Sequence, residues 1–146
     1  MDTHSEPLGR ALLDMITNSP ECADLRKVPP DLLSLRTHEI YRDLNEWLSG
    51  KTLAEMGRYY RNLGAERAEQ GVSLSHLIWA IRAAKRNLWE FLEREGLWEN
   101  PIEIHGSLEL LALLDRFFDE AIYNAAVGYE RYHAARAQES LVAHSG

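Results

Sequence analysis

Residues 63–92, LGAERAEQGVSLSHLIWAIRAAKRNLWEFL, decide the fold because they end one helix and begin the next within a few positions. Gly71 follows a run of helix formers, at the place where a left-handed residue commonly ends a helix. Ser73 or Ser75 can then accept hydrogen bonds from the free N–H groups of the following first turn. The next helix carries a stripe at helical spacing, made of Leu74, Leu77, Ile78, Ile81, Lys85, Leu88 and Leu92. Two helices joined so tightly are expected to be antiparallel neighbours.

The chain before this stretch also has helical spacing. Residues 1–7 are polar and are expected to form a flexible N-terminus, followed by a short amphipathic helix over residues 8–17. Residues 21–28 look irregular, with at most one further helical turn. A second helix is predicted from an N-cap at Asp31 to Ser49, and a capping box formed by Thr52 and Glu55 predicts the start of a third.

The last helix is predicted to start at Ser107, after a loop over residues 97–106, and to run to Ala137 or beyond. At ~1.5 Å per residue it would extend about 45–50 Å, more than a compact domain of this size needs. Its apolar residues form two sets rather than one stripe. One contains Leu111, Phe118, Ile122, Ala125, Tyr129 and Tyr132, and the other Leu110, Leu114, Phe117, Ala121 and Gly128.

Two apolar faces on one helix predict two partners, the domain's own core and something outside it. The candidate homodimer-interface residues are therefore Leu110, Leu114, Phe117, Phe118, Ala121 and Gly128. Residues 8–134 are predicted to form the helical sensory domain and residues 135–146 an exit helix or linker toward an output module. The fold class is all-α, an antiparallel, globin-like helical bundle of about five helices with a long C-terminal helix.

Composition restricts the class of protein. A chain of 146 residues suits a single domain. A formal net charge of −7 argues against partners that present phosphate, whether nucleic acid or an anionic membrane surface. No signal peptide or membrane-spanning run occurs, and Cys22 is the only cysteine, so a soluble protein of the reducing cytoplasm is expected.

The histidines are the first candidates for chemistry. No histidine pairs with a second ligand at metal-binding spacing, so we expect no metal site. An axial heme ligand is an alternative that we keep open, with His76, His105 and His133 as candidates, although no cofactor is expected. His38 precedes Glu39, as in some phosphoacceptor helices, which leaves a phosphotransfer bundle as a second alternative.

A ligand pocket is a further possibility, since aromatic and cationic side chains lie on or beside the apolar stripes. Packing in the core and ion pairs with neighbouring glutamates are the competing uses of the same residues. No nucleophile elbow, phosphate loop or HExxH motif is present, so the domain is not expected to be an enzyme. The candidate pocket residues are Tyr60, Arg67, Trp79, Arg82 and Tyr123.

The block from residue 56 to residue 92 resembles the N-terminal domain family named for the RsbT co-antagonist RsbRD. Domains of that family show a helix ending LGxxRaxxGvsL and then a helix rich in Leu, Ala and Arg. The matching positions here are Leu63, Gly64, Arg67, Gly71, Val72, Ser73, Leu74, Ala80, Arg82 and Arg86. The likeness extends from about Leu8 to Ala137.

The resemblance implies an all-helical, globin-like input domain with no required cofactor and no catalytic residues. Such domains stand at the N-terminus of stressosome proteins, sensor histidine kinases and some transcription regulators. They commonly form homodimers, and their last helix runs into an output domain in cis or serves a signalling partner. No kinase, STAS or DNA-binding motif follows residue 146, so we expect an isolated input domain or a piece of a longer chain.

Overall fold

The computed structural model describes residues 2–48, 50, 52–94 and 101–145. Its elements are α1 (Asp2–Asn18), the 3-10 helix η1 (Pro20–Lys27), α2 (Pro30–Leu48), α3 (Leu53–Glu69), α4 (Leu74–Arg94) and α5 (Pro101–Ser145). The described residues contain no strand, which confirms the all-α class with a long C-terminal helix. None of these helices combines the length and the apolar character that crossing a membrane requires.

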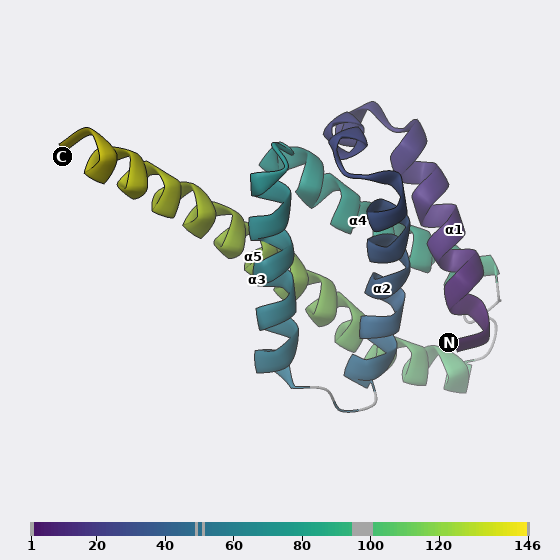
Figure 1. The fold of residues 1–146 in the computed structure, drawn as a ribbon. Helices are drawn as coiled ribbons and strands as arrows, with labels where there is room; N and C mark the ends of the chain where they lie inside the picture. Colours follow the sequence, from purple (N-terminus) through teal and green to yellow (C-terminus); the bar gives the residue numbers. More distant parts are fainter. Residues whose placement is uncertain (1, 49, 51, 95–100, 146) are drawn as a thin grey trace.

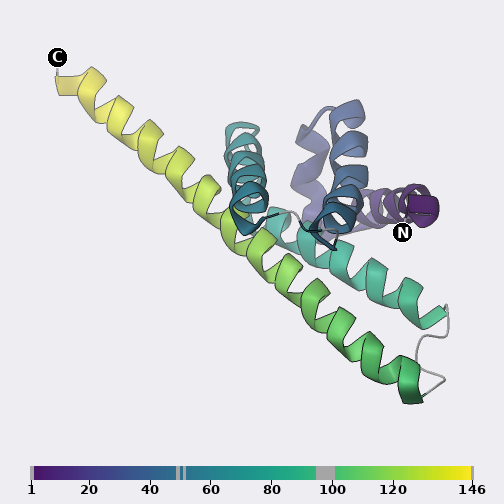
Figure 2. The same ribbon diagram turned by 90° about the horizontal axis from the view of Figure 1, so that it is seen from below.

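The helices form two layers. Figure 2 shows α4 and α5 side by side and antiparallel, with α1, η1, α2 and α3 stacked on one face of this pair. Helix α3 crosses over α5, and α5 continues well past the crossing to the C-terminus (Figure 1). One face of the α4–α5 pair is therefore covered by the rest of the chain, and the opposite face is left open.

The α3–α4 junction ends a helix as the sequence predicts. Gly71 has a φ of 77°, the left-handed conformation that favours glycine. The Val72 N–H donates to the Arg67 carbonyl oxygen at 3.0 Å, and the Gly71 N–H donates to the Ala68 carbonyl oxygen at 3.1 Å. These two bonds make a Schellman motif, which satisfies carbonyl groups that the end of α3 leaves free.

Ser73 occupies the N-cap position of α4, but its side chain does not cap the helix. Its carbonyl oxygen accepts the N–H groups of His76 and Leu77 at 3.1 Å each. Its hydroxyl instead donates to the Asp24 carboxylate of η1, which also accepts the Ser73 N–H at 2.9 Å. The junction is thus tied to η1, a tertiary contact that a capping rule does not contain.

Helices α3 and α4 diverge from this junction, and the long contact of α3 is with α5. A Cβ added to Gly64 would lie 1.9 Å from the carbonyl oxygen of Ala125, and one added to Gly128 would lie 1.9 Å from that of Arg61. Only glycine lets the two backbones touch at both points. The expected antiparallel pairing of α3 with α4 is therefore wrong, because the glycines select α5 as the neighbour of α3.

Several boundaries differ from those predicted. Helix α1 begins at Asp2, six residues before the predicted start. The prediction missed its first turns because they are polar and carry no apolar stripe that a sequence pattern could detect. Helices α2 and α5 begin at Pro30 and Pro101, whose fixed φ suits the first helical position. Asp31 and Ser107 therefore lie inside helices, and residues 101–106 are helical rather than loop, while residues 97–100 lie outside the described residues. The Thr52 cap is confirmed, since its side chain accepts the Glu55 N–H at 3.2 Å.

Candidate functional site

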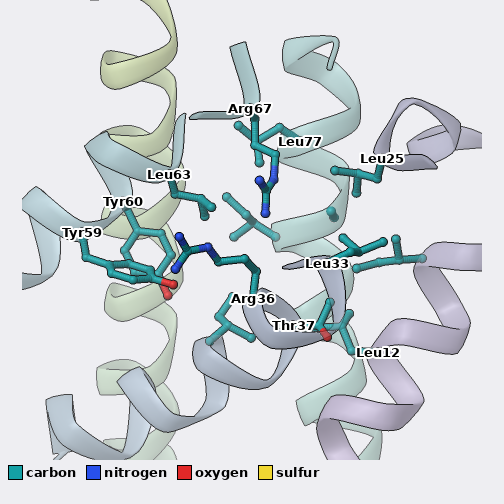
Figure 3. A pocket seen from close by; sticks show the side chains of 14 residues that line it. Leu12, Leu25, Leu33, Arg36, Thr37, Tyr59, Tyr60, Leu63, Arg67 and Leu77 are labelled. Carbon is teal, nitrogen blue, oxygen red and sulfur yellow. The ribbon is translucent and has the colours of Figure 1, made fainter. Parts of the chain in front are cut away.

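A cavity of about 50 Å³ lies between the helices of the upper layer and α4, and we call it the inter-helix cavity. Every element except α5 contributes to its wall. Figure 3 shows the Arg36 guanidinium beside two tyrosine rings on one side, leucines on the other side, and the Arg67 guanidinium pointing into the space between them. The residues that line it are Leu12, Ile16, Leu25, Leu33, Arg36, Thr37, Ile40, Tyr59, Tyr60, Leu63, Arg67, Leu77, Ala80 and Ile81.

Arg67 reaches this cavity from the last turn of α3, and its side chain is only 3% exposed. Its Nη1 donates to the Gln70 side-chain oxygen at 2.8 Å and to Glu66 Oε1 at 3.2 Å. Both bonds use the same nitrogen, so Nε and Nη2 make no hydrogen bond within the described part of the chain. Burial lowers the pKa of Arg67, and the neighbouring Glu66 opposes that change only in part.

Arg36 enters from α2 and joins two acidic side chains. Its Nη1 donates to Glu39 Oε2 at 2.8 Å, and its Nη2 donates to Glu66 Oε2 at 3.1 Å. Its Nε is buried and has no hydrogen-bond partner among the described residues. Glu66 therefore lies between the guanidinium groups of Arg36 and Arg67, which links α2 to α3 across the mouth of the cavity.

Glu39 completes this polar cluster. Burial raises its pKa, but hydrogen bonds from the Tyr59 hydroxyl and from Arg36, with the charges of Arg36 and Arg42, outweigh burial and lower the pKa below its usual value. The Arg36 guanidinium also lies 5.9 Å from the centre of the Tyr59 ring. This cluster holds Glu39 ionised and fixes the Tyr59 ring at the cavity wall.

Tyr60 lies between the cavity and α5. Its side chain is buried, and its ring meets that of Phe117 edge to face with the centroids 6.0 Å apart. Burial, and then the charge of Asp43, raise the pKa of Tyr60 well above its usual value. A change in the position of the Tyr60 ring would therefore displace the Phe117 side chain of α5.

The cavity brings together only part of the predicted pocket. Tyr60 and Arg67 line it, whereas Trp79 and Arg82 face a groove outside and Tyr123 is 66% exposed on α5. The sequence did not lead us to predict Arg36 or Thr37 as pocket residues. A signal was available for Arg36, which stands four residues after Leu32 and four before Ile40 on the apolar side of α2.

The open face of the α4–α5 pair carries the second candidate surface, a groove of about 500 Å³. We call it the outer face and define it as Trp79, Arg82, Arg86 and Trp89 of α4 with Asp119 and Ile122 of α5. Lys85, which also lines this groove, forms an ion pair with Asp115 of α5. The face combines large aromatic area with charges of both signs.

The predicted dimer-interface residues lie in a different place. Leu114, Phe117, Phe118, Ala121 and Gly128 are all buried in the chain's own core, and Leu110 is partly buried against it. The assignment of these residues to a contact with a second copy is wrong. These buried residues of α5 pack inside the chain, where α3 crosses α5 and α4 lies alongside it.

None of the three histidines whose side chains are described, His38, His76 and His133, lines the inter-helix cavity. The Nδ1 of His76 accepts the Asp24 N–H at 3.1 Å, and His133 is exposed with its ring 4.9 Å from that of Tyr129. The side chain of His105 lies outside the described ones. The His38 ring packs against Gly9 of α1, and its Nδ1 lies 2.8 Å from the Ser34 carbonyl oxygen, so the ring is half-buried and held by neighbouring helix residues.

The end of α5 leaves the domain. Residues 133–143 are all exposed, and Figure 1 shows this part of the helix extending away from the other elements. Leu141 and Val142 are 71% and 66% exposed. We call residues 133–145 the projecting segment. Just before it, the Tyr129 hydroxyl donates to the Val72 carbonyl oxygen at 2.6 Å, which ties the base of the segment to the α3–α4 junction.

Comparison with known proteins bears on this arrangement. A family model described as the RsbT co-antagonist protein rsbRD N-terminal domain matches residues 7–143, which include the inter-helix cavity and most of α5. Neither curated proteins nor solved structures gave a significant match. Domains of this family are regulatory rather than catalytic. The chain belongs to the family of RsbT co-antagonist rsbRD N-terminal domains.

Proposed function

We propose that this domain is the cytoplasmic sensory input domain of a bacterial signalling protein, either a sensor histidine kinase or a stressosome-type regulator, and that it acts as a homodimer. The observation that carries the proposal is the position of α3. Its one side forms a wall of the inter-helix cavity, and its other side touches the backbone of the helix that leaves the domain. A change at the cavity therefore has a short mechanical route to the projecting segment.

The relay is a population shift between two positions of the joined α3–α5 pair relative to the other helices. A ligand or partner that alters the cavity favours one position of Tyr60, Leu63 and Arg67. Because Gly64 and Gly128 hold the two backbones in contact, α3 cannot slide without moving α5. The bond from Arg61 Nη1 to the Asn124 side-chain oxygen, at 2.7 Å, adds a polar link at the same crossing. The projecting segment then conveys the change to an output domain in cis or to a signalling partner.

The outer face is the surface that we assign to the second copy. Arg82 and Arg86 lie on α4 and Asp119 lies on α5 of the same face, so a two-fold axis through the groove would place basic α4 of each copy against acidic α5 of the other. Trp79 and Trp89 supply the large aromatic area that is enriched at interfaces. The isologous arrangement uses one surface twice and needs no other face of the molecule.

Light scattering coupled to size exclusion over a concentration series tests the dimer. We expect a dimer at micromolar concentration and at least tenfold weaker association in Arg82→Glu, because like charges would then face each other across the axis. Arg58→Glu, at an exposed site on α3, is the matched control and should associate as the unsubstituted chain does. A chain that stays monomeric at every concentration would refute the dimer, and an Arg82→Glu dimer of undiminished affinity would move the interface elsewhere.

No cofactor takes part in this proposal. The absorption spectrum of each eluting species, with and without added hemin, tests that point. We expect no Soret band in the spectrum of any fraction that contains the protein. A sharp band that disappears on substitution of His76 or His133 would instead favour the heme alternative.

A further inference from the structure

The inter-helix cavity has two chemically different walls, and this asymmetry indicates what it binds. The Arg36 guanidinium lies beside the tyrosine rings, the Arg67 guanidinium points into the cavity between Leu63 and Leu77, and Leu12, Leu25 and Leu33 lie on the side opposite the tyrosines (Figure 3). A molecule that fits both walls has one polar end and one apolar end.

The polar wall offers hydrogen-bond donors rather than surplus charge. Three cations, Arg36, Arg42 and Arg67, stand among three acidic side chains, Glu39, Glu66 and Asp43, so the formal charges balance. The donors, by contrast, are in excess. Only Nη1 of Arg67 donates hydrogen bonds to other residues, and its Nε–H and Nη2–H groups have no acceptor among the described residues. The buried Nε of Arg36 also has no acceptor among them.

The geometry of the unpaired Nε–H and Nη2–H groups of Arg67 indicates which kind of acceptor would bind there. These two N–H groups are parallel and match the two oxygens of a carboxylate in a bidentate pair. A buried guanidinium with these two groups unpaired carries a desolvation cost that a bound carboxylate would remove. The side chain is 3% exposed, so bulk water supplies little of that compensation.

The volume limits the rest of the molecule. A site of about 50 Å³ holds roughly three to five non-hydrogen atoms, given the volume that one enclosed water needs. We propose that the inter-helix cavity binds a small aliphatic monocarboxylate of about two or three carbons. Its carboxylate pairs with Arg67 Nε and Nη2, and its alkyl chain lies against Leu12 and Leu33. This assignment rests on the proposed sensory role, because it names the class of ligand that the domain senses.

The test is a titration of the ¹⁵N-labelled full chain at constant ionic strength, followed by amide and arginine Nε–H chemical shifts. The probes are sodium formate, acetate, propionate, butyrate and hexanoate, with propan-1-ol and sodium nitrate as comparisons. We expect saturable shifts at residues lining the cavity, a Kd on the order of 1 mM, and tighter binding of acetate or propionate than of formate or hexanoate. No saturable shift with any carboxylate would overturn the assignment, and so would equal affinity for propan-1-ol or for nitrate.

Two cavity variants, with one control variant, test whether the carboxylate binds in the inter-helix cavity. Arg67→Met keeps much of the side-chain volume but removes the donors, and it should weaken propionate binding at least tenfold. Arg58→Met, on the exposed side of the same helix, should leave the affinity unchanged. Ala80→Val narrows the cavity with Arg67 intact and should also weaken binding, which keeps the test open if Arg67→Met folds poorly. Affinity unaffected by both cavity variants would overturn the site.

The same samples separate this assignment from the proposed relay. Propionate that binds at the cavity but changes neither the α5 amide shifts nor the dimer affinity supports the carboxylate site and refutes the relay. A dimer that forms as proposed but shows no carboxylate binding refutes the carboxylate site and supports the dimer of the proposed function.

Discussion

On the side of α3 that faces α5, Gly64 and Gly128 bring two backbones into contact, and no side chain separates them. On the side that faces α2 and α4, the same helix borders a cavity and presents Tyr59 and Arg67 to it. The first side is packed without any freedom to adjust, and the second has spare volume and unused donors. A helix built in this way can respond on one side while staying fixed to its partner on the other, as an input domain requires.

The largest effect is expected at the crossing. Gly64→Ala places a Cβ 1.9 Å from the Ala125 carbonyl oxygen, and backbone cannot move aside as a side chain can. We expect a loss of about 3 kcal/mol or more in the free energy of unfolding, measured by urea unfolding with circular dichroism.

Gly57→Ala is the matched control on the same helix. Its Cβ would meet only the side chains of Arg61 and Asn124, at 2.9 and 3.1 Å, and these can shift. We expect a change within about 1 kcal/mol, since alanine also favours the helix by a similar amount. Equal stabilities for Gly64→Ala and Gly57→Ala would show that the crossing is not as tight as described.

A smaller difference is expected between large-to-small substitutions on the two sides of α3. Phe117→Ala empties a fully buried position beneath the crossing and should cost about 3–5 kcal/mol. Leu63→Ala removes a half-buried side chain that already borders the cavity, so it loses fewer contacts and should cost about 1–2 kcal/mol. Urea unfolding of both variants measures the contrast, and a larger cost at Leu63 than at Phe117 would reverse our view of which side is rigid.

The smallest effect concerns acid stability at the cavity. The folded-state pKa of Glu39 is lowered, so its contribution to stability is present above its unfolded pKa and is lost as the pH falls below about 4.5 and through the folded value. Glu39→Gln should lower the stability at neutral pH by about 1–2 kcal/mol and flatten the decline in acid. Thermal unfolding from pH 7 to pH 3 measures both effects. Glu93→Gln, at an exposed site on α4, should show the same dependence of stability on pH as the unsubstituted chain. If the stability of Glu39→Gln falls with pH in parallel with that of Glu93→Gln, Glu39 does not contribute to the loss of stability in acid.

Much of the helical framework could be predicted because it depends on local geometry. The left-handed position of Gly71 and the cap at Thr52 follow from backbone rules within one turn of the chain. Leu77, Ile81 and Leu88 are buried, as their spacing indicates. Arg67 could be recognised as unusual because it interrupts an apolar stripe.

The candidate site could be predicted only in part. Arg36 and Arg67 are 31 positions apart along the chain, and no pattern states that both contact Glu66. Trp79 and Arg82 were grouped with Tyr60 because of their residue types and their places on or beside apolar stripes, and the fold separates them, because α4 directs them to the opposite side of its own axis. A site assembled from several helices depends on how those helices rotate, which spacing does not specify.

The sequence by itself determined most of the helical segments, where the helix after residue 63 ends, and which side of most helices is apolar, because these follow from backbone capping and periodicity. Only the tertiary structure decided what each apolar side meets. Phe117 and Phe118 were assigned to a second copy and lie in the chain's own core, since periodicity shows that a face is buried but not against which partner. The partner of α3 was settled by Gly64 and Gly128, two glycines 64 positions apart whose backbones can approach only when the chain has folded.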